Sequence, residues 1–212
     1  MPEKPTTSGG YPPGQVARVK STCLYVATKL GDLMPELVVV GGLVPSLLID
    51  QGRLPKNVTP HVGTLDLDLG LAFALVGEHR YQAVAERLRA AGFEMDRNEE
   101  GRLTRQRWRI SDPPVTVDFL IEPEHSAETQ AGRLFPLAKD WAAIIAPGLH
   151  LAFKNNQVVT IAGQTIVGET ASRDVLVCGA GGVCGSQSAR LLNQPFRPCN
   201  VAGFCYLLTL TG

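Results

Sequence analysis

Two aspartates on one short stretch of this chain carry the clearest chemical signal. Residues 64–71 read TLDLDLGL, and this alternation of polar and apolar residues predicts a β-strand. Successive side chains on a strand point to opposite faces, so Asp66 and Asp68 are expected to share one face and the leucines the other. Two neighbouring carboxylates repel each other unless their face is well solvated or a cation lies between them. We interpret the pair as ligands of a divalent metal ion.

A third acid, Asp118, interrupts an otherwise apolar predicted strand over residues 115–121. A carboxylate in a buried strand is costly unless it is paired or bound to a metal. Asp118 is therefore either salt-bridged to a nearby arginine or a third metal ligand beside Asp66 and Asp68. Carboxylate, water and phosphate oxygens are the ligands that Mg²⁺ prefers. Two such ions ~3.5–4 Å apart can activate an attacking hydroxyl and stabilise a leaving pyrophosphate.

Gly41 and Gly42 lie between a predicted strand (residues 36–40) and a predicted helix (residues 43–51). Glycines allow backbone N–H groups to approach a phosphate closely, and a helix N-terminus carries partial positive charge. This position predicts contact with a triphosphate. His61, in the loop before the acidic strand, is either a substrate-positioning residue or simply exposed.

Three arginines alternate along a predicted strand over residues 103–110: Arg105, Arg107 and Arg109. Because they share one face, their guanidinium groups suit the recognition of phosphate. The alternative is a solvated strand face whose arginines pair with nearby acids such as Glu99 and Glu100.

Hydrophobic periodicity predicts the elements that must position these residues. The expected helices cover residues 14–33, 43–51 and 78–91. The expected strands cover residues 36–40, 64–71, 93–96, 103–110 and 115–121, with short β segments in 141–153, 158–162 and 165–167. Residues 122–140 are expected to form a loop, and 162–164 a turn.

The order of three motifs resembles the DNA polymerase β-type nucleotidyltransferase superfamily. The motifs are Val38–Gly42, Asp66–Asp68 and Val117–Phe119. More narrowly, residues 17–177 resemble the AbiEii-like branch of minimal nucleotidyltransferases, which are toxins in abortive-infection and toxin–antitoxin systems.

The resemblance implies an α+β fold with a mixed sheet flanked by helices. It further implies an NTP donor, Mg²⁺ held by Asp66, Asp68 and Asp118, and a triphosphate held by Gly41 and Gly42. The acceptor would be an RNA, such as a tRNA end, or a protein side chain, and an antitoxin protein is a further expected partner.

Composition limits the remaining function classes. The chain has 212 residues, with 20 basic and 20 acidic residues, so bulk charge does not favour indiscriminate nucleic-acid binding. No apolar run reaches the ~18 residues that span a bilayer. Five cysteines without a secretory signal are expected to be reduced thiols in the cytoplasm, although the last four, spaced in two pairs, also leave a zinc site as an alternative.

We expect a disordered leader (residues 1–14), a nucleotidyltransferase domain (residues 15–177) and an atypical tail (residues 178–212). Residues 174–185 look like a strand entering a dinucleotide-binding glycine loop, but no acidic residue follows, so we do not expect a cofactor there. The tail also lacks the lysine-bearing helices that the resemblance implies. We hypothesise a truncated or frameshifted end, and the alternative function is then an inert binding or regulatory module with the same fold.

Overall fold

The computed structural model describes residues 11–50, 53–54, 63–72, 78–110, 114–123 and 128–179. The first ten residues of the predicted leader, His61, and the predicted tail beyond residue 179 lie outside the described residues, as do three of the five cysteines.

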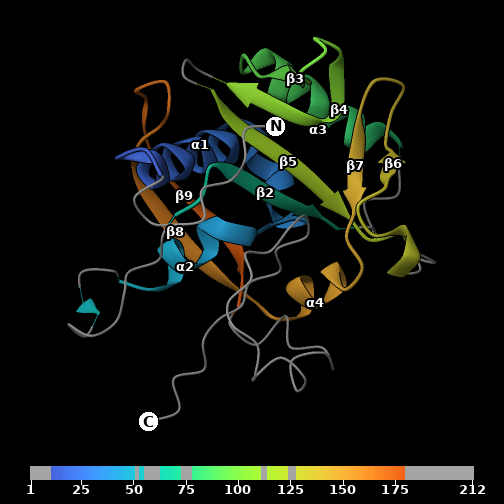
Figure 1. The fold of residues 1–212 in the computed structure, drawn as a ribbon. Coiled ribbons are helices and arrows are strands. Elements are labelled where there is room, and N and C mark those ends of the chain that lie inside the picture. Colours follow the sequence, from blue (N-terminus) through green and yellow to red (C-terminus); the bar gives the residue numbers. More distant parts are fainter. Residues whose placement is uncertain are drawn as a thin grey trace.

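One mixed sheet of nine strands organises the described chain (Figure 1). The strands are β1 Leu37–Val40, β2 Asp66–Leu71, β3 Glu94–Arg97, β4 Leu103–Ile110, β5 Val115–Ile121, β6 Leu134–Pro136, β7 Ala142–Ile145, β8 Asn156–Gln164 and β9 Thr170–Cys178. Their order is β3-β4-β5-β2-β1-β9-β8, with β7 beside the end of β5 and β6 beside β7. The pairs β1–β9, β2–β5 and β5–β7 are parallel and the others antiparallel.

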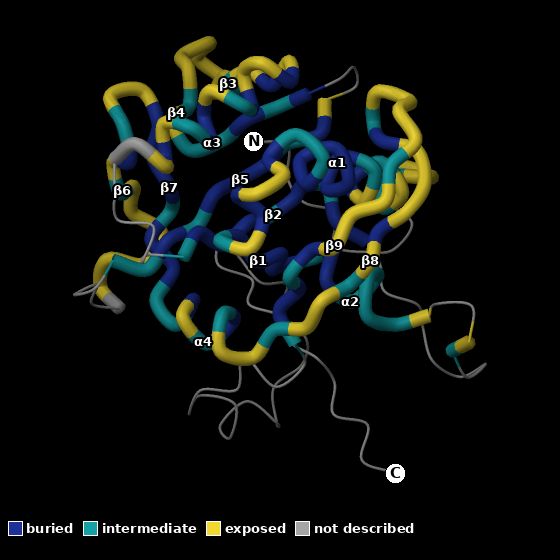
Figure 2. Tube along the Cα trace, turned by 180° about the vertical axis from the view of Figure 1, so that it is seen from behind, coloured by how far each residue is buried: buried dark blue, intermediate teal, exposed yellow. Residues whose placement is uncertain are grey.

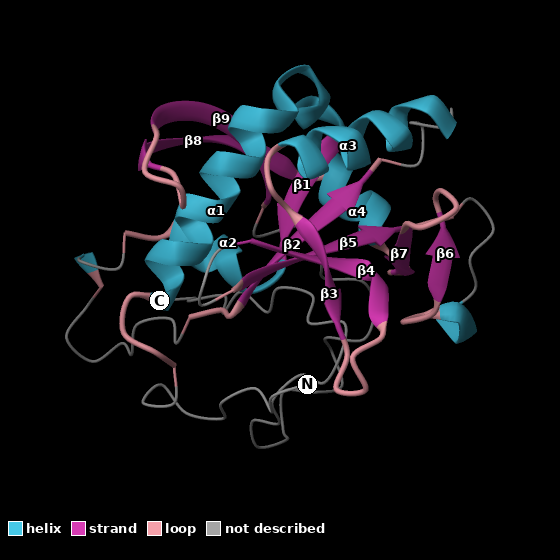
Figure 3. Cartoon of the chain, turned by 90° about the horizontal axis from the view of Figure 1, so that it is seen from above, coloured by secondary structure: helices cyan, strands magenta, loops and turns pink. Residues whose placement is uncertain are grey.

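Helices flank this sheet, so the predicted α+β class is confirmed. The helices are α1 Gln15–Leu30, α2 Val44–Leu48, α3 Glu78–Ala90 and α4 Leu149–Lys154, with 3₁₀ turns η2 Gly31–Glu36, η3 Gly41–Leu43 and η6 Glu128–Gln130. Figure 3 shows α1 and α3 on the same side of β2, β4 and β5. None of the helices in the described ranges is both long enough and apolar enough to cross a membrane.

The central strands β1, β2 and β5 are the most buried part of the sheet (Figure 2). β1 reads LVVV and is buried throughout, as expected of a strand covered on both faces. Under α3, the Trp141 ring meets Tyr81, Trp108 and Phe119 edge to face, with ring centroids 5.1–6.2 Å apart. This aromatic cluster fixes β4, β5 and α3 against one another.

Truncating the centre of the aromatic cluster should destabilise the fold strongly. Trp141 is fully buried, so Trp141→Ala is expected to lower the free energy of unfolding by about 3–5 kcal/mol. Leu103→Ala, at a largely exposed apolar residue of β4, should change it by less than about 0.5 kcal/mol. Urea denaturation measures both, and comparable losses in the two variants would contradict this account of the core.

The strand predictions over residues 103–110 and 115–121 are confirmed as an antiparallel hairpin, but four predictions near the C-terminal end are wrong. The loop 122–140 contains β6, which pairs with β7. Residues 162–164, expected to be a turn, continue β8. Residues 165–167, expected to be a β segment, belong instead to the turn at Thr165–Glu169, where Gly168 N donates to Thr165 O. The β segment expected in 141–153 ends at Ile145 and gives way to α4.

Glu122, just beyond β5, explains why α4 is a helix. Its carboxylate accepts hydrogen bonds from the backbone N–H groups of Gly148 and His150 and from the His150 ring. The first-turn N–H groups of a helix have no partners within the helix, so a carboxylate there stabilises it. Burial raises the pKa of Glu122, but the two backbone hydrogen bonds and the His150 ring together outweigh it, so that the net pKa lies below its ordinary value.

This lowered pKa predicts an acid-sensitive contribution to stability. A carboxyl with a depressed folded-state pKa stabilises the fold above its unfolded-state value, about 4.5, and this stabilisation is lost as the pH falls through the folded-state pKa. Glu122→Gln should therefore destabilise the chain at pH 5.5, and the difference from wild type should shrink below pH 4.5. Urea titrations between pH 3 and 5.5 test this, with the exposed Glu86→Gln as control. A difference that grows on acidification would contradict the assignment.

Candidate metal centre

The parallel pairing of β2 with β5 brings the three predicted carboxylates together. Asp68 lies directly opposite Asp118 in the register, and Asp66 lies opposite Thr116. Side chains opposite each other on neighbouring strands share a face of the sheet. One carboxylate oxygen from each of the three aspartates lies within 4.8 Å of the other two. The sequence prediction that these acids form one cluster is therefore supported by their positions.

The cluster is buried rather than well solvated. Asp66 is 5% exposed and Asp118 is 4% exposed, while Asp68 is of intermediate exposure. Of the two arrangements expected to relieve the repulsion between Asp66 and Asp68, open solvation therefore does not apply. Positive charge close to the cluster is the other arrangement that stabilises such carboxylates.

Arg107 supplies one such charge. It lies opposite Asp118 across the β4–β5 pair, and the two side chains form a bidentate ion pair. Arg107 Nε donates to Asp118 Oδ1 at 2.8 Å, and Nη2 donates to Oδ2 at 2.5 Å. The hydrogen bonds with Asp118 raise the pKa of Arg107 despite its partial burial, with a further contribution from the charge of Asp66. The ion pair expected as one alternative for Asp118 is confirmed. Because Asp118 also adjoins the other two carboxylates, its role as a metal ligand stays a prediction.

Thr64 is a supporting residue that sequence reasoning missed. Its hydroxyl lies 2.9 Å from the backbone oxygen of Asp66 and 3.1 Å from Asp66 Oδ1, and it donates to either. Thr64 is itself buried. The signal was present in the sequence, since a hydroxyl two residues before a strand carboxylate lies on the same face.

Gly41 and Gly42 form a close-fitting turn against the cluster. Gly41 has φ +73°, and a Cβ placed on it would lie 2.1 Å from Asp68 Oδ2. A Cβ on Gly42 would lie 2.8 Å from the Thr64 side chain. The glycine backbone therefore approaches the acids more closely than any other residue type permits. The following helix α2 has only five residues, so its dipole adds little to anion binding.

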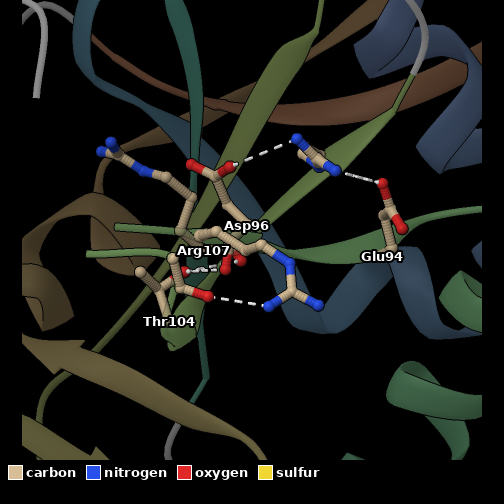
Figure 4. A network of polar contacts seen from close by, with 7 residues as sticks. Glu94, Asp96, Thr104 and Arg107 are labelled. Carbon is tan, nitrogen blue, oxygen red and sulfur yellow. Dashed lines mark hydrogen bonds and ion pairs between the residues drawn. The ribbon is translucent and has the colours of Figure 1, made fainter. Parts of the chain in front are cut away.

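The three arginines of β4 have separate partners. Arg105 Nη2 donates to the backbone oxygen of Ala138 at 3.0 Å and remains exposed. Arg109 donates to Glu94 Oε1, and its Nη1 lies 3.9 Å from Asp96 Oδ1. Figure 4 shows this network, in which Thr104 also bonds to the backbone oxygens of Asp96 and Arg107. Arg107 thus pairs with Asp118 of β5, and Arg109 pairs with Glu94 of β3. Contact of these arginines with phosphate stays a prediction.

The chemistry of these residues fits a hard divalent cation. All three candidate ligands are carboxylates, which are the donors that Mg²⁺, Mn²⁺ and Ca²⁺ prefer. Together with the guanidinium of Arg107 they carry a formal charge of −2. The bidentate pair with Arg107 occupies one lone pair on each oxygen of Asp118, and each oxygen has another.

Comparison of the chain with models of known protein families, with curated proteins and with solved structures finds no match. The assignment of function therefore depends on the carboxylate cluster and the groups around it.

The contact between Gly41 and Asp68 can be isolated by a matched pair of substitutions. Gly101 has φ +77°, and a Cβ at this residue would have nothing within 4 Å, so Gly101→Ala should cost only the left-handed strain, about 1–2 kcal/mol. Gly41→Ala meets the same strain and also the Asp68 carboxylate, which should add about 1–3 kcal/mol. Urea denaturation of the two variants measures the difference, and equal losses would show that the close approach has no energetic consequence.

Proposed function

We propose that this chain is a divalent-cation-dependent nucleotidyltransferase that moves a nucleoside monophosphate from an NTP to a hydroxyl of an RNA or a protein. The observation that carries the proposal is the meeting of Asp66, Asp68 and Asp118 beside the Gly41–Gly42 turn. Buried carboxylates that converge from neighbouring strands are stabilised by cations, and the glycine turn lies directly against Asp68 and Thr64 of this cluster.

In this proposal Asp66 and Asp68 hold the Mg²⁺, and Asp118 completes the site. The bound cation supplies charge stabilisation for the phosphoryl group and lowers the barrier to displacement of pyrophosphate. Thr64 fixes the Asp66 carboxylate, and the backbone of Gly41 and Gly42 contacts the triphosphate.

Of the two roles open to Asp118 towards the acceptor hydroxyl, the structure favours one. Either orienting or deprotonating the acceptor hydroxyl is compatible with an aspartate at this position. Both oxygens of the Asp118 carboxylate accept hydrogen bonds from Arg107, which fix the carboxylate in one orientation. We therefore assign Asp118 to orientation of the acceptor.

The cellular part of the proposal rests on the family resemblance alone. It comprises membership of the AbiEii-like branch, action as a cytoplasmic toxin in a toxin–antitoxin or abortive-infection system, and neutralisation by an antitoxin protein. Arg105, exposed on β4, is the candidate contact for the acceptor or the triphosphate.

A second candidate function is an inert nucleotidyltransferase-fold module that binds nucleotide or a partner without turnover. One observation favours it: both oxygens of Asp118 already bond to Arg107. A structural ion pair at this position would need no catalytic role.

Transfer of labelled nucleotide distinguishes these functions. The purified chain is incubated with Mg²⁺ and each α-phosphate-labelled NTP, together with total RNA or cell protein. We expect label on one acceptor class, and a loss of more than about 100-fold in Asp66→Asn and Asp68→Asn, because each removes a metal ligand. Asp140→Asn, at an exposed acid that pairs with Arg89, is the matched control and should retain transfer.

Transfer that persists when Asp66 and Asp68 are replaced together would refute the assignment. Nucleotide binding without transfer, measured by equilibrium dialysis, would support the inert module instead.

A further inference from the structure

Arg107 covers the Asp118 side of the carboxylate cluster with a positive charge. In a two-ion site the metals are ~3.5–4 Å apart and share carboxylate ligands between them. Here the Asp118 side of the cluster is occupied by a guanidinium that contacts both carboxylate oxygens, at 2.8 and 2.5 Å. A second divalent ion at Asp118 would lie next to this fixed positive charge.

The position of Arg107 is tightly determined. Its side chain is 15% exposed and its partner carboxylate is 6% exposed, so the pair is held between its neighbours. The backbone of Arg107 is restrained as well, because its carbonyl oxygen accepts from Thr104, which also bonds to the Asp96 carbonyl (Figure 4). A buried guanidinium with a matched bidentate partner does not leave without exposing an unpaired charge.

Arg107 also changes the charge that the cluster presents. It cancels one of the three negative charges, and the remaining two match one divalent cation. Two divalent cations would leave the same group of side chains with an excess of positive charge in a site of low exposure, which is electrostatically unfavourable.

We infer that Arg107 takes the place of a second metal ion at Asp118, so that the cluster binds one divalent cation, held mainly by Asp66 and Asp68. This inference rests on the proposed function in one respect only, namely that the cluster binds a metal. Arg107 is in this account a specificity-determining residue that sets the number of cations, and the phosphoryl chemistry depends on one ion together with the guanidinium.

The number of bound Mn²⁺ ions tests this inference without any assay of activity. Mn²⁺ accepts the same oxygen ligands as Mg²⁺, and electron paramagnetic resonance measures the free ion in a titration of the full chain. Wild type should saturate at one Mn²⁺ per chain. Arg107→Met removes the charge while keeping an apolar side chain of similar length, and should bind two.

Two further variants identify the ions that are counted. Arg89→Met removes an exposed arginine that pairs with Asp140 and should bind one ion, like wild type. Replacing Asp66 and Asp68 with asparagine together should abolish binding. Because Arg107→Met leaves Asp118 without its partner, its melting temperature should rise more on addition of Mn²⁺ than that of wild type.

The outcomes separate this inference from the proposed function. Two ions in wild type would overturn the inference and leave metal-dependent transfer intact, and this measurement needs no variant to fold. No ion in wild type would overturn both. A folded Arg107→Met chain that still binds one ion would overturn the inference, whereas one ion in wild type and two in this variant would support it.

Discussion

The in-register parallel pairing of β2 and β5 is the constraint on which the rest of the site depends. It sets Asp68 opposite Asp118 and places Asp66 one step along the same face. A shift of one residue in this register would move the acids of one strand to the opposite face, among the leucines and aromatic rings of the core. The apolar side chains of both strands oppose that shift, since Leu67, Leu69, Val117 and Phe119 are fully buried under the helices.

The same pairing brings three carboxylates close together, and the neighbouring elements supply the groups that surround them. β4 contributes Arg107 directly opposite Asp118, and the turn after β1 allows the backbone to come close to Asp68 because residue 41 is glycine. Removal of one partner from a buried pair typically costs about 3–5 kcal/mol, because the other charge is left unpaired. Arg107 is therefore both a structural necessity for the cluster and a determinant of the charge that a ligand meets.

Much of this arrangement follows from the sequence. The strand boundaries at 103–110 and 115–121 follow from their alternation and from the turn residues between them, and the Asp66–Asp68 pair follows from its period of two. The register between neighbouring strands could not be predicted from the sequence. Three arginines with equal spacing cannot be ranked until β4 is aligned on β5, and only then does Arg107 differ from Arg105 and Arg109. The helix α4 was not predicted for a related reason. Its first turn is stabilised by Glu122, which lies in a different part of the chain.

We propose that these three carboxylates form a site for a divalent cation. The most direct measurement is anomalous diffraction from crystals of the chain grown with Mn²⁺. We expect one anomalous peak within about 2.0–2.6 Å of carboxylate oxygens of both Asp66 and Asp68. A well-ordered cluster without a peak, at Mn²⁺ concentrations that saturate any binding seen in solution, would contradict it.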